Sequence, residues 1–349
     1  MILITGAGGL IGYSVSNFFL QRNYKVFGIE NNKRKFFFGK NGSIEQNILN
    51  LKKNKNFEHF DADITNNAKI KKIFQKKKFD LVVHAAAQPS HDWSASNPKL
   101  DFNINALGTL NILEAIKIYN KNTIFIFLST NKVYGDYVNN FNYKEEKLRF
   151  EILKKYKNGF DETLSIDNSI HSPFGASKLS ADILTQEYGK YFNLKTVCLR
   201  AGCLTGHNHS GVALHGFLSY LFKCSFYKKK YQIFGYKGKQ VRDNLSADDV
   251  AEIIYLILKK KPKNGIVYNI GGGRESNISI LEAIKKCEEL TKNKFKYTYT
   301  PKERIGDHKF WITDMTKFKT DYPTFTIKKN INNILTDMLE YEKHQFQKK

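Results

Sequence analysis

The first twenty residues place a short apolar segment directly before a run of glycines. Residues 1–5 (MILIT) predict a strand, and Gly6, Gly9 and Gly12 fall in the segment that follows it. From residue 11 to residue 19, apolar side chains recur with the period of one helix face. Glycines allow a tight turn and let a pyrophosphate approach the backbone, where its charge meets the positive end of the helix. The segment therefore predicts a strand, a turn and a helix that bind a dinucleotide.

A second apolar strand supports this prediction. Residues 25–29 (KVFGI) run into Glu30, eighteen residues after Gly12. A carboxylate at this strand end accepts hydrogen bonds from an adenosine ribose, which favours NAD over the 2′-phosphate of NADP. Arg34 lies nearby and weakens that preference. The residues expected to contact the dinucleotide here are Gly6, Gly9, Leu10, Ile11, Gly12, Glu30 and Asn31.

Four further strand-like segments, at 57–64, 80–87, 123–130 and 196–200, alternate with helical stretches. This alternation predicts an α/β fold with a Rossmann-type, doubly wound parallel sheet. Asp63 and Ile64, at the end of the third strand, are placed to flank an adenine. Ala85, Ala86 and Gln88, after the fourth, would let the cofactor lie close to the backbone. Ordinary packing at strand ends explains these five residues equally well.

The chain of 349 residues has a formal net charge of +23, which would attract nucleic acid or a phosphorylated small molecule. The lysines lie in scattered groups, as at 69–78 and 228–230, a distribution typical of solvated surfaces. We therefore expect no nucleic-acid partner.

The compartment is predicted from the start of the chain, its apolar runs and its cysteines. No basic leader precedes the first apolar residues, and no apolar run approaches membrane-spanning length. The four cysteines form no CxxC pair. These observations predict a cytoplasmic protein with reduced thiols and no membrane partner.

Several motifs together resemble the extended short-chain dehydrogenase/reductases, which are NAD(P)-dependent epimerases and dehydratases of nucleotide sugars. They are TGAGGLIG, DADI, HAAAQ, NINALGT (103–109), STNKVYGD (129–136), the segment around Lys178, and GYKGKQVRDNLSADDVA (235–251). The resemblance covers nearly the whole chain. Within the family, HSPFGASK (171–178) and YNIGGGRESN (268–277) are among the segments most similar to the CDP-tyvelose (CDP-paratose) 2-epimerase branch.

The resemblance implies two interleaved domains. Residues 1–200 would form the NAD-binding Rossmann domain, with segments near 235–270 returning to it. Residues 201–349 would form a smaller domain that binds a nucleotide sugar, with a CDP-sugar favoured. The family also implies a homodimer.

The resemblance assigns roles to residues around the reacting sugar. Thr130 falls where the family has a hydroxyl that bonds the reacting sugar hydroxyl, and Lys178 falls on the lysine that binds the nicotinamide ribose. Asn131 and Lys132 stand where dehydratases carry an acidic pair, which favours an epimerase. Asn105, in NINALGT, is expected near the cofactor.

Position 174 departs from the family pattern, because Phe174 replaces the tyrosine that takes and returns a proton. The expected chemistry is oxidation of a sugar carbon to a ketone by NAD and re-reduction on the other face. Lys132, Lys178 and His171 are candidates for the missing base, whereas Tyr134 is expected to be packed. Lys132 could equally bind substrate oxygens, and His171 could be structural.

The C-terminal half supplies the expected substrate contacts. Arg242 and Arg304 match family positions that bind the nucleotide diphosphate, for which the planar guanidinium offers paired donors. An ion pair between Arg242 and Asp243 is the alternative. His209, with His207 and His215, is expected to contact the sugar or a loop, and no metal site is predicted. The pattern at 279–282 predicts a capping box that begins a helix, which makes the preceding GGGR a turn.

Two alternatives to the 2-epimerase remain open. One is 4-epimerisation of another nucleotide sugar. The other is a catalytically silent relative that binds NAD, a nucleotide sugar or RNA, which Phe174 and the net charge favour.

Overall fold

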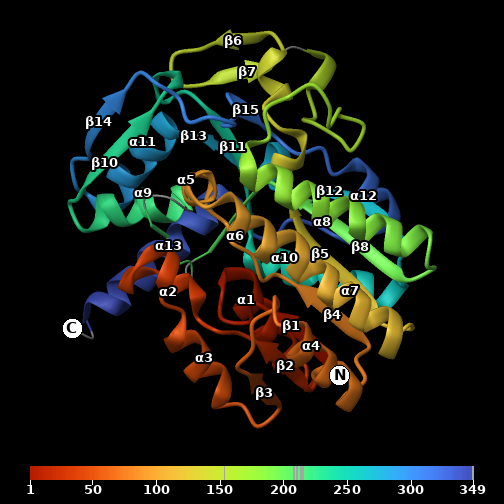
Figure 1. The fold of residues 1–349 in the computed structure, drawn as a ribbon. Coiled ribbons are helices and arrows are strands. Elements are labelled where there is room, and N and C mark those ends of the chain that lie inside the picture. Colours follow the sequence, from red (N-terminus) through yellow and green to blue (C-terminus); the bar gives the residue numbers. More distant parts are fainter. Residues whose placement is uncertain (153, 207–208, 210, 213–215, 348–349) are drawn as a thin grey trace. The chain divides into compact units, whose positions relative to one another are not determined.

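The computed structural model describes residues 1–152, 154–206, 209, 211–212 and 216–347 (Figure 1). The chain divides into two compact units. Unit 1 comprises residues 1–133, 172–201 and 250–268, and unit 2 comprises residues 134–171, 202–249 and 269–349.

Unit 1 is built on a seven-stranded sheet with the strand order β12-β8-β5-β4-β1-β2-β3, and the five pairings from β3 to β8 are parallel. This order confirms the predicted doubly wound Rossmann-type sheet, because it reverses direction between β1 and β4. The strands are β1 (Ile2–Thr5), β2 (Val26–Ile29), β3 (Phe57–Phe60), β4 (Leu81–His84), β5 (Ile124–Thr130), β8 (Lys195–Ala201) and β12 (Ile266–Ile270).

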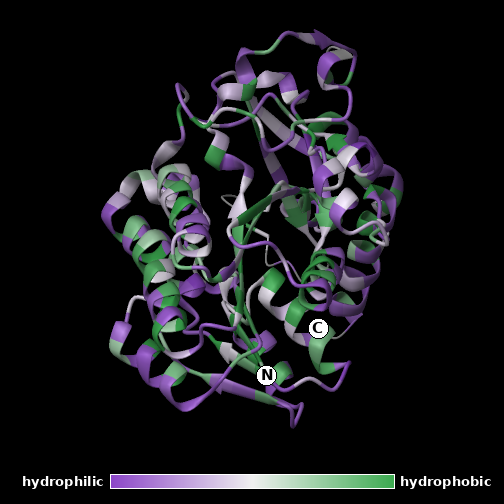
Figure 2. Cartoon of the chain, turned by 90° about the vertical axis from the view of Figure 1, so that its right-hand side faces the viewer, coloured by the Kyte–Doolittle hydropathy of each residue, from purple (hydrophilic) through white to green (hydrophobic). Residues whose placement is uncertain are grey.

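Helices cover this sheet on both sides, and Figure 2 shows the hydrophobic strands in green between them. The helices are α1 (Leu10–Leu20), α2 (Lys33–Phe38), α3 (Glu45–Lys52), α4 (Asn67–Lys76), α5 (His91–Ser96), α6 (Pro98–Phe102), α7 (Gly108–Tyr119), α8 (Ser172–Lys190) and α10 (Ala247–Lys260). Short turns of helix lie at η1 (Lys40–Gly42), η2 (Asn103–Leu107) and η3 (Asn131–Tyr134). The core of unit 1 joins apolar side chains of the strands, such as Phe125 and Phe127, to those of the helices, such as Ile112 and Ala181.

The predicted strands at 57–64 and 80–87 are too long. After β3 the Asp63 carboxylate accepts hydrogen bonds from the backbone N–H and the hydroxyl of Thr65, which forms a turn instead of a strand. After β4 the chain leaves the sheet at Ala85. Both strands therefore end before the residues predicted to contact the cofactor.

Unit 2 contains short strands and four helices among its described residues. The strands are β6 (Tyr143–Glu145), β7 (Phe150–Ile152), β9 (Cys203–Thr205), β10 (Lys230–Phe234), β11 (Val241–Ser246), β13 (Asn277–Ser279), β14 (Lys296–Thr300) and β15 (Phe310–Trp311). The helices are α9 (Phe217–Phe226), α11 (Ile280–Thr291), α12 (Thr316–Asp321) and α13 (Ile331–Gln347). Its helical turns are η4 (Tyr137–Asn140), η5 (Lys154–Tyr156), η6 (Tyr236–Gly238) and η7 (Gly273–Glu275).

Strand β11 is the centre of unit 2, because it pairs with β13, β15 and β9. The predicted capping box is confirmed: the Ser279 hydroxyl accepts from the Glu282 backbone N–H, and the Glu282 carboxylate accepts from the Ser279 backbone N–H. The GGGR segment before it is the turn that contains η7, as predicted. Among the described residues, no helix has both the length and the apolar character needed to cross a membrane.

Candidate active site

The glycine turn between β1 and α1 has the close contacts that a dinucleotide site requires. Gly6 has a φ of +70°, and a Cβ there would lie 2.8 Å from the backbone nitrogen of Ala86. A Cβ at Gly12 would lie 2.0 Å from the carbonyl oxygen of Gly6. Gly9 is the N-cap of α1, and the first N–H groups of a helix, which here include those of Leu10 and Ile11, have no partners within the helix. The turn therefore fits a pyrophosphate.

Glu30 lies across from the glycine turn and is held by three backbone N–H groups. Its carboxylate accepts hydrogen bonds from Gly8 at 3.1 Å, Asn31 at 2.9 Å and Asn32 at 3.0 Å. Burial raises the pKa of Glu30, and these three donors offset part of the rise. A carboxylate has about four acceptor positions, so one is left for a ribose hydroxyl. This geometry fits the adenosine end of NAD.

Asp63 and Ile64 have structural roles in addition to the predicted adenine contact. Burial raises the pKa of Asp63, but hydrogen bonds from Lys33 and Thr65 lower it by more than burial raises it. The net shift of the pKa is therefore downward. Asn31 connects this carboxylate to the Glu30 segment, because its side-chain amide donates to Asp63 at 3.2 Å. Ile64 is buried in the core of unit 1. The adenine contact of both residues stays a prediction.

A buried polar cluster, which we call the Gln88 network, comprises Gln88, Asp101, Asn105 and Ser177. The Asp101 carboxylate accepts from Gln88 at 2.7 Å, from Asn105 at 3.1 Å and from the Ser177 hydroxyl at 2.5 Å. The Gln88 backbone N–H donates to Asn105 at 2.9 Å. The network therefore joins the segment after β4 to α6 and α8.

Ala85 and Ala86 lie between the glycine turn and this network. Their backbone N–H groups donate to the carbonyl and the hydroxyl of Thr5, both at 3.2 Å. The same hydroxyl is 2.6 Å from His84, whose other ring nitrogen is 3.0 Å from Thr109. Burial, with the positive charge of Lys178, lowers the pKa of His84 to about 3, so this histidine is neutral at physiological pH.

Lys178 is buried on α8 and reaches the carboxyl end of β5. Its Nζ donates to the carbonyl of Leu128 at 2.7 Å, two residues before Thr130, and lies 4.0 Å from the centre of the Phe127 ring. Burial lowers the pKa of Lys178 to about 8, while the carboxylate of Asp182 raises it in part. The structure thus brings the predicted ribose-binding lysine to the strand that carries Thr130.

Thr130, Asn131 and Lys132 lie at that strand end as predicted from the sequence. The Thr130 hydroxyl accepts from the Lys132 backbone N–H at 3.2 Å and donates to the Asn131 amide oxygen at 3.4 Å. Asn131 is buried, and Lys132 is half-buried at the start of η3. The side chains that follow β5 therefore provide a hydroxyl, an amide and an ammonium.

Phe174 lies in the first turn of α8 and is buried, with 7% of its surface exposed. Its ring packs against His91 of α5, with 4.8 Å between the ring centres. His91 was not among the site residues predicted from the sequence. The signal for it was a histidine three residues after the HAAAQ motif, near the carboxyl end of a central strand.

Two other residues considered from the sequence belong to unit 2. His171 Nδ1 is 3.1 Å from the Ser169 carbonyl oxygen. Tyr134 is fully buried, and its hydroxyl donates to Asn269 at 2.8 Å, which confirms that it is packed.

The two predicted phosphate-binding arginines of unit 2 are both connected to Asp307, one through its side chain and the other through its backbone carbonyl. Arg242 donates to the Asp307 carboxylate and to the backbone carbonyl of Val241, both at 2.7 Å. The Asp307 backbone N–H donates to the Arg304 carbonyl at 3.0 Å, and the Arg304 guanidinium lies 4.5 Å from the centre of the Phe234 ring. The ion pair of Arg242 is therefore with Asp307, and not with Asp243.

His209 of unit 2 is buried against Gly216, and its carbonyl accepts from the Ser219 hydroxyl at 3.1 Å and from Lys223 at 3.2 Å. His207 and His215 lie outside the described residues. Within the described ranges, no group of three His, Cys, Asp or Glu side chains could hold a metal ion.

Comparison with known proteins adds to this geometry. The chain is 33% identical over 322 residues to CDP-paratose 2-epimerase of Salmonella typhi, which covers 90% of this chain and 91% of that protein. It is 28% identical to UDP-glucuronate 4-epimerase of Thermodesulfobacterium geofontis, over 91% of this chain and 88% of that protein. Among solved structures, the fold matches UDP-glucuronic acid 4-epimerase from Bacillus cereus in complex with UDP-glucuronic acid and NAD. The TM-score is 0.77 at 27% identity, with 99% of each chain covered.

Dehydratases are also among the relatives: dTDP-glucose 4,6-dehydratase of Salmonella typhimurium is 29% identical over 83% of this chain and 76% of that protein. Residues 2–271 match the description "NAD dependent epimerase/dehydratase family". A match over most of the chain, on a Rossmann-type sheet with a glycine turn that fits the cofactor, shows that the chain belongs to the NAD-dependent epimerase/dehydratase family, and its cofactor is NAD.

Proposed function

We propose that the chain is an NAD-dependent epimerase that inverts carbon 2 of a CDP-paratose or CDP-tyvelose type of sugar nucleotide. The arrangement at the end of β5 carries the proposal, because Lys178 reaches the strand whose end bears Thr130, Asn131 and Lys132. An amide and an ammonium cannot perform the carboxylate chemistry with which related dehydratases eliminate water. The similarity to CDP-paratose 2-epimerase supports the choice of substrate class.

Bound NAD would supply the hydride acceptor for oxidation of the sugar carbon and the hydride donor for its re-reduction on the opposite face. The Thr130 hydroxyl would orient the sugar hydroxyl on that carbon. Lys178, which is charged at neutral pH because its pKa is about 8, would stabilise the negative charge that develops on the sugar oxygen. These residues therefore supply positioning and electrostatic stabilisation.

The remaining requirement is a proton acceptor, because the phenyl ring of Phe174 cannot accept one. Lys132 is the candidate that the sequence favours, and burial next to a cationic nicotinamide would lower its pKa. In the alternative role, its ammonium binds substrate oxygens. A Lys132→Met variant with full turnover would exclude Lys132 as the base.

The substrate contacts proposed for unit 2 are Arg242 and Arg304 on the diphosphate and His209 on the nucleotide sugar. Asp307 pairs with Arg242 and holds its guanidinium in place, which leaves its other N–H groups for phosphate oxygens. We also propose a homodimer, which the family resemblance implies.

The test begins with the purified protein. The bound nicotinamide is released by denaturation and identified, and the native protein is then mixed with a panel of nucleotide sugars. We expect NAD and transient absorbance of reduced nicotinamide with a CDP-sugar. Substrates labelled with deuterium at single carbons distinguish a 2-epimerase from a 4-epimerase. A 2-epimerase would lose the label at carbon 2, and a 4-epimerase would lose the label at carbon 4.

Phe174 favours a second candidate, a silent relative that binds NAD and a nucleotide sugar, or RNA, without turnover. Bound NAD that no sugar reduces would support it. Tight RNA binding that weakens steeply with salt, in the absence of turnover, would favour the RNA-binding form.

A further inference from the structure

Phe174 stands where the family pattern has the tyrosine that takes and returns a proton, so the site at this turn of α8 lacks that hydroxyl. Phe174 and Lys178 are four residues apart on α8, so both side chains lie on the same face of the helix. Both are buried. A group that replaces the tyrosine must therefore lie against the ring of Phe174, on the side of α8 that carries Lys178.

His91 satisfies this requirement by contact. Its ring lies 4.8 Å from the ring of Phe174, at an interplanar angle of 57°. Its Nδ1 is 3.0 Å from the hydroxyl oxygen of Ser172, the first residue of α8. His84 also lies near Lys178, but its pKa of about 3 prevents it from holding a proton at neutral pH. His91 is the imidazole that both the packing and the hydrogen bond place beside position 174.

The Gln88 network fixes the two sides of this contact. The Gln88 amide donates to the carbonyl of Ser90, the residue before His91, at 2.9 Å. At the other end, the Ser177 hydroxyl is 3.0 Å from the carbonyl of Phe174. Buried, mutually bonded polar groups of this kind hold a functional side chain in one position.

The hydrogen bond to Ser172 suits a group that must both accept and return a proton. A serine hydroxyl can accept from Nδ1–H or donate to Nδ1, because its hydrogen rotates. When Nδ1 donates, Nε2 of the neutral ring is a base. When the ring is protonated, both nitrogens are donors and Nε2 is an acid. The Ser172 contact therefore survives both states.

We propose that His91 replaces the missing tyrosine as the general base and acid of the epimerase, an assignment that rests on the function proposed above. In the forward direction the sugar O–H bond breaks and an N–H bond forms at Nε2, while the hydride leaves the same carbon for NAD and the carbon is oxidised to a carbonyl. In the second half of the reaction the hydride returns from the reduced cofactor to the opposite face of the carbonyl carbon, and Nε2 returns its proton to the sugar oxygen. Lys132 then binds substrate oxygens through its ammonium and takes no part in the proton transfer.

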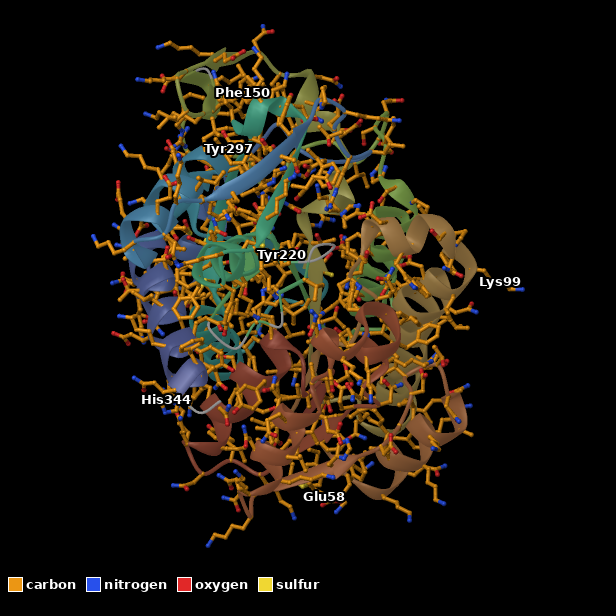
Figure 3. The ribbon with its side chains drawn as sticks, turned by 90° about the vertical axis from the view of Figure 1, so that its left-hand side faces the viewer. Glu58, Lys99, Phe150, Tyr220, Tyr297 and His344 are labelled. Atoms are coloured by element: carbon orange, nitrogen blue, oxygen red, sulfur yellow. The ribbon has the colours of Figure 1, made fainter. Side chains whose placement is uncertain are left out.

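The experiment compares four forms of the full-length protein with wild type. His91→Asn keeps a polar atom near Ser172 but cannot titrate. His344→Gln is the matched control, because His344 is exposed on α13 (Figure 3). Phe174→Tyr restores the family hydroxyl, alone and combined with His91→Asn. Each form is assayed for retained NAD, melting temperature and the rate at which the sugar panel reduces bound NAD.

We expect His91→Asn to retain NAD and its melting temperature but to lose about 100-fold or more in the reduction rate, the usual contribution of general acid–base catalysis. The double variant should recover much of that rate, and His344→Gln should match wild type. A His91→Asn rate close to wild type would overturn the assignment and leave the epimerase standing. The assignment would also be overturned if the reduction rate fell together with the NAD content or the melting temperature, or if Phe174→Tyr did not restore the rate in the double variant.

Two results would separate this proposal from the function on which it rests. If only Phe174→Tyr reduces NAD, the natural chain has no proton carrier, and the role of His91 is refuted while the binding sites stand. If neither wild type nor Phe174→Tyr responds to any sugar, the epimerase function fails and the role of His91 fails with it.

Discussion

Neutralising Asp182 is the sharpest test of how the site is supported. Asp182 of α8 is fully buried and accepts from Arg200 at 2.8 and 3.1 Å, from Ser129 at 2.5 Å and from Gln186 at 2.7 Å. The side chain of Arg200 is only 7% exposed. Asp182→Asn would therefore remove the carboxylate that neutralises the buried guanidinium charge of Arg200.

Removing one partner of a buried ion pair costs about 3–5 kcal/mol. The matched control is Glu58→Gln in the same unit, whose carboxylate is 3.6 Å from Lys77, with both side chains at least one-third exposed (Figure 3). Such a surface pair contributes about 0–1 kcal/mol. We therefore expect Asp182→Asn to lower the free energy of unfolding by about 3 kcal/mol more than Glu58→Gln.

Urea unfolding and amide hydrogen exchange in β5 and β8, the strands that carry Ser129 and Arg200, measure this difference. Exchange reports the local stability even if the two units unfold separately. A second readout is functional: the charge of Asp182 raises the pKa of Lys178, so its loss should move the alkaline limb of the activity profile to lower pH. A difference between the variants below about 1 kcal/mol would refute the reasoning, because it would mean that the pair is effectively solvated.

Two other predictions concern the cofactor and the dependence of stability on pH. Gly12→Ala should yield protein without NAD, since the new Cβ would lie 2.0 Å from the carbonyl oxygen of Gly6; the nicotinamide content after purification measures this. Burial raises the pKa of Asp243 from 3.8 to about 6, so its contribution to stability is present below pH 4 and is lost as the pH rises through 6. This pH-dependent decrease in the free energy of unfolding is about 3 kcal/mol, and the Asp243→Asn variant should not show it.

Each of these predictions has a contradicting result. NAD retained at the wild-type level by Gly12→Ala would show that the turn can move. An unchanged pH profile in Asp243→Asn would assign the titration to another carboxyl group.

Local patterns in the sequence were sufficient for six of the seven strands of the sheet, two of which were predicted too long, whereas β12 was not among the predicted strands. Strands β1 and β2 lie within the predicted segments, and helix α1 contains the predicted apolar pattern, because apolar period and glycine position depend on neighbouring residues. The capping box at Ser279 was predictable for the same reason. The excess length assigned to the third strand came from reading Asp63 as part of the strand instead of the turn that follows.

Contacts between distant segments could not be predicted in this way. Arg242 had an acidic neighbour in sequence, yet its ion pair is with Asp307, which the fold of unit 2 brings alongside. His91 and Phe174 are separated by more than eighty residues and meet only because α5 packs on α8. A single sequence contains the residue types of such a site but not the pairs that they form.

The position of Glu30 has a consequence for engineering the cofactor preference. The carboxylate that would disfavour the 2′-phosphate of NADP is also the acceptor for the backbone of Gly8, Asn31 and Asn32. A redesign that replaces it with a small or basic residue removes repulsion and dismantles the loop in the same step. Acceptance of NADP therefore requires new acceptors for those three N–H groups before the charge is changed, and a single substitution at this position would be expected to lose one cofactor without gaining the other.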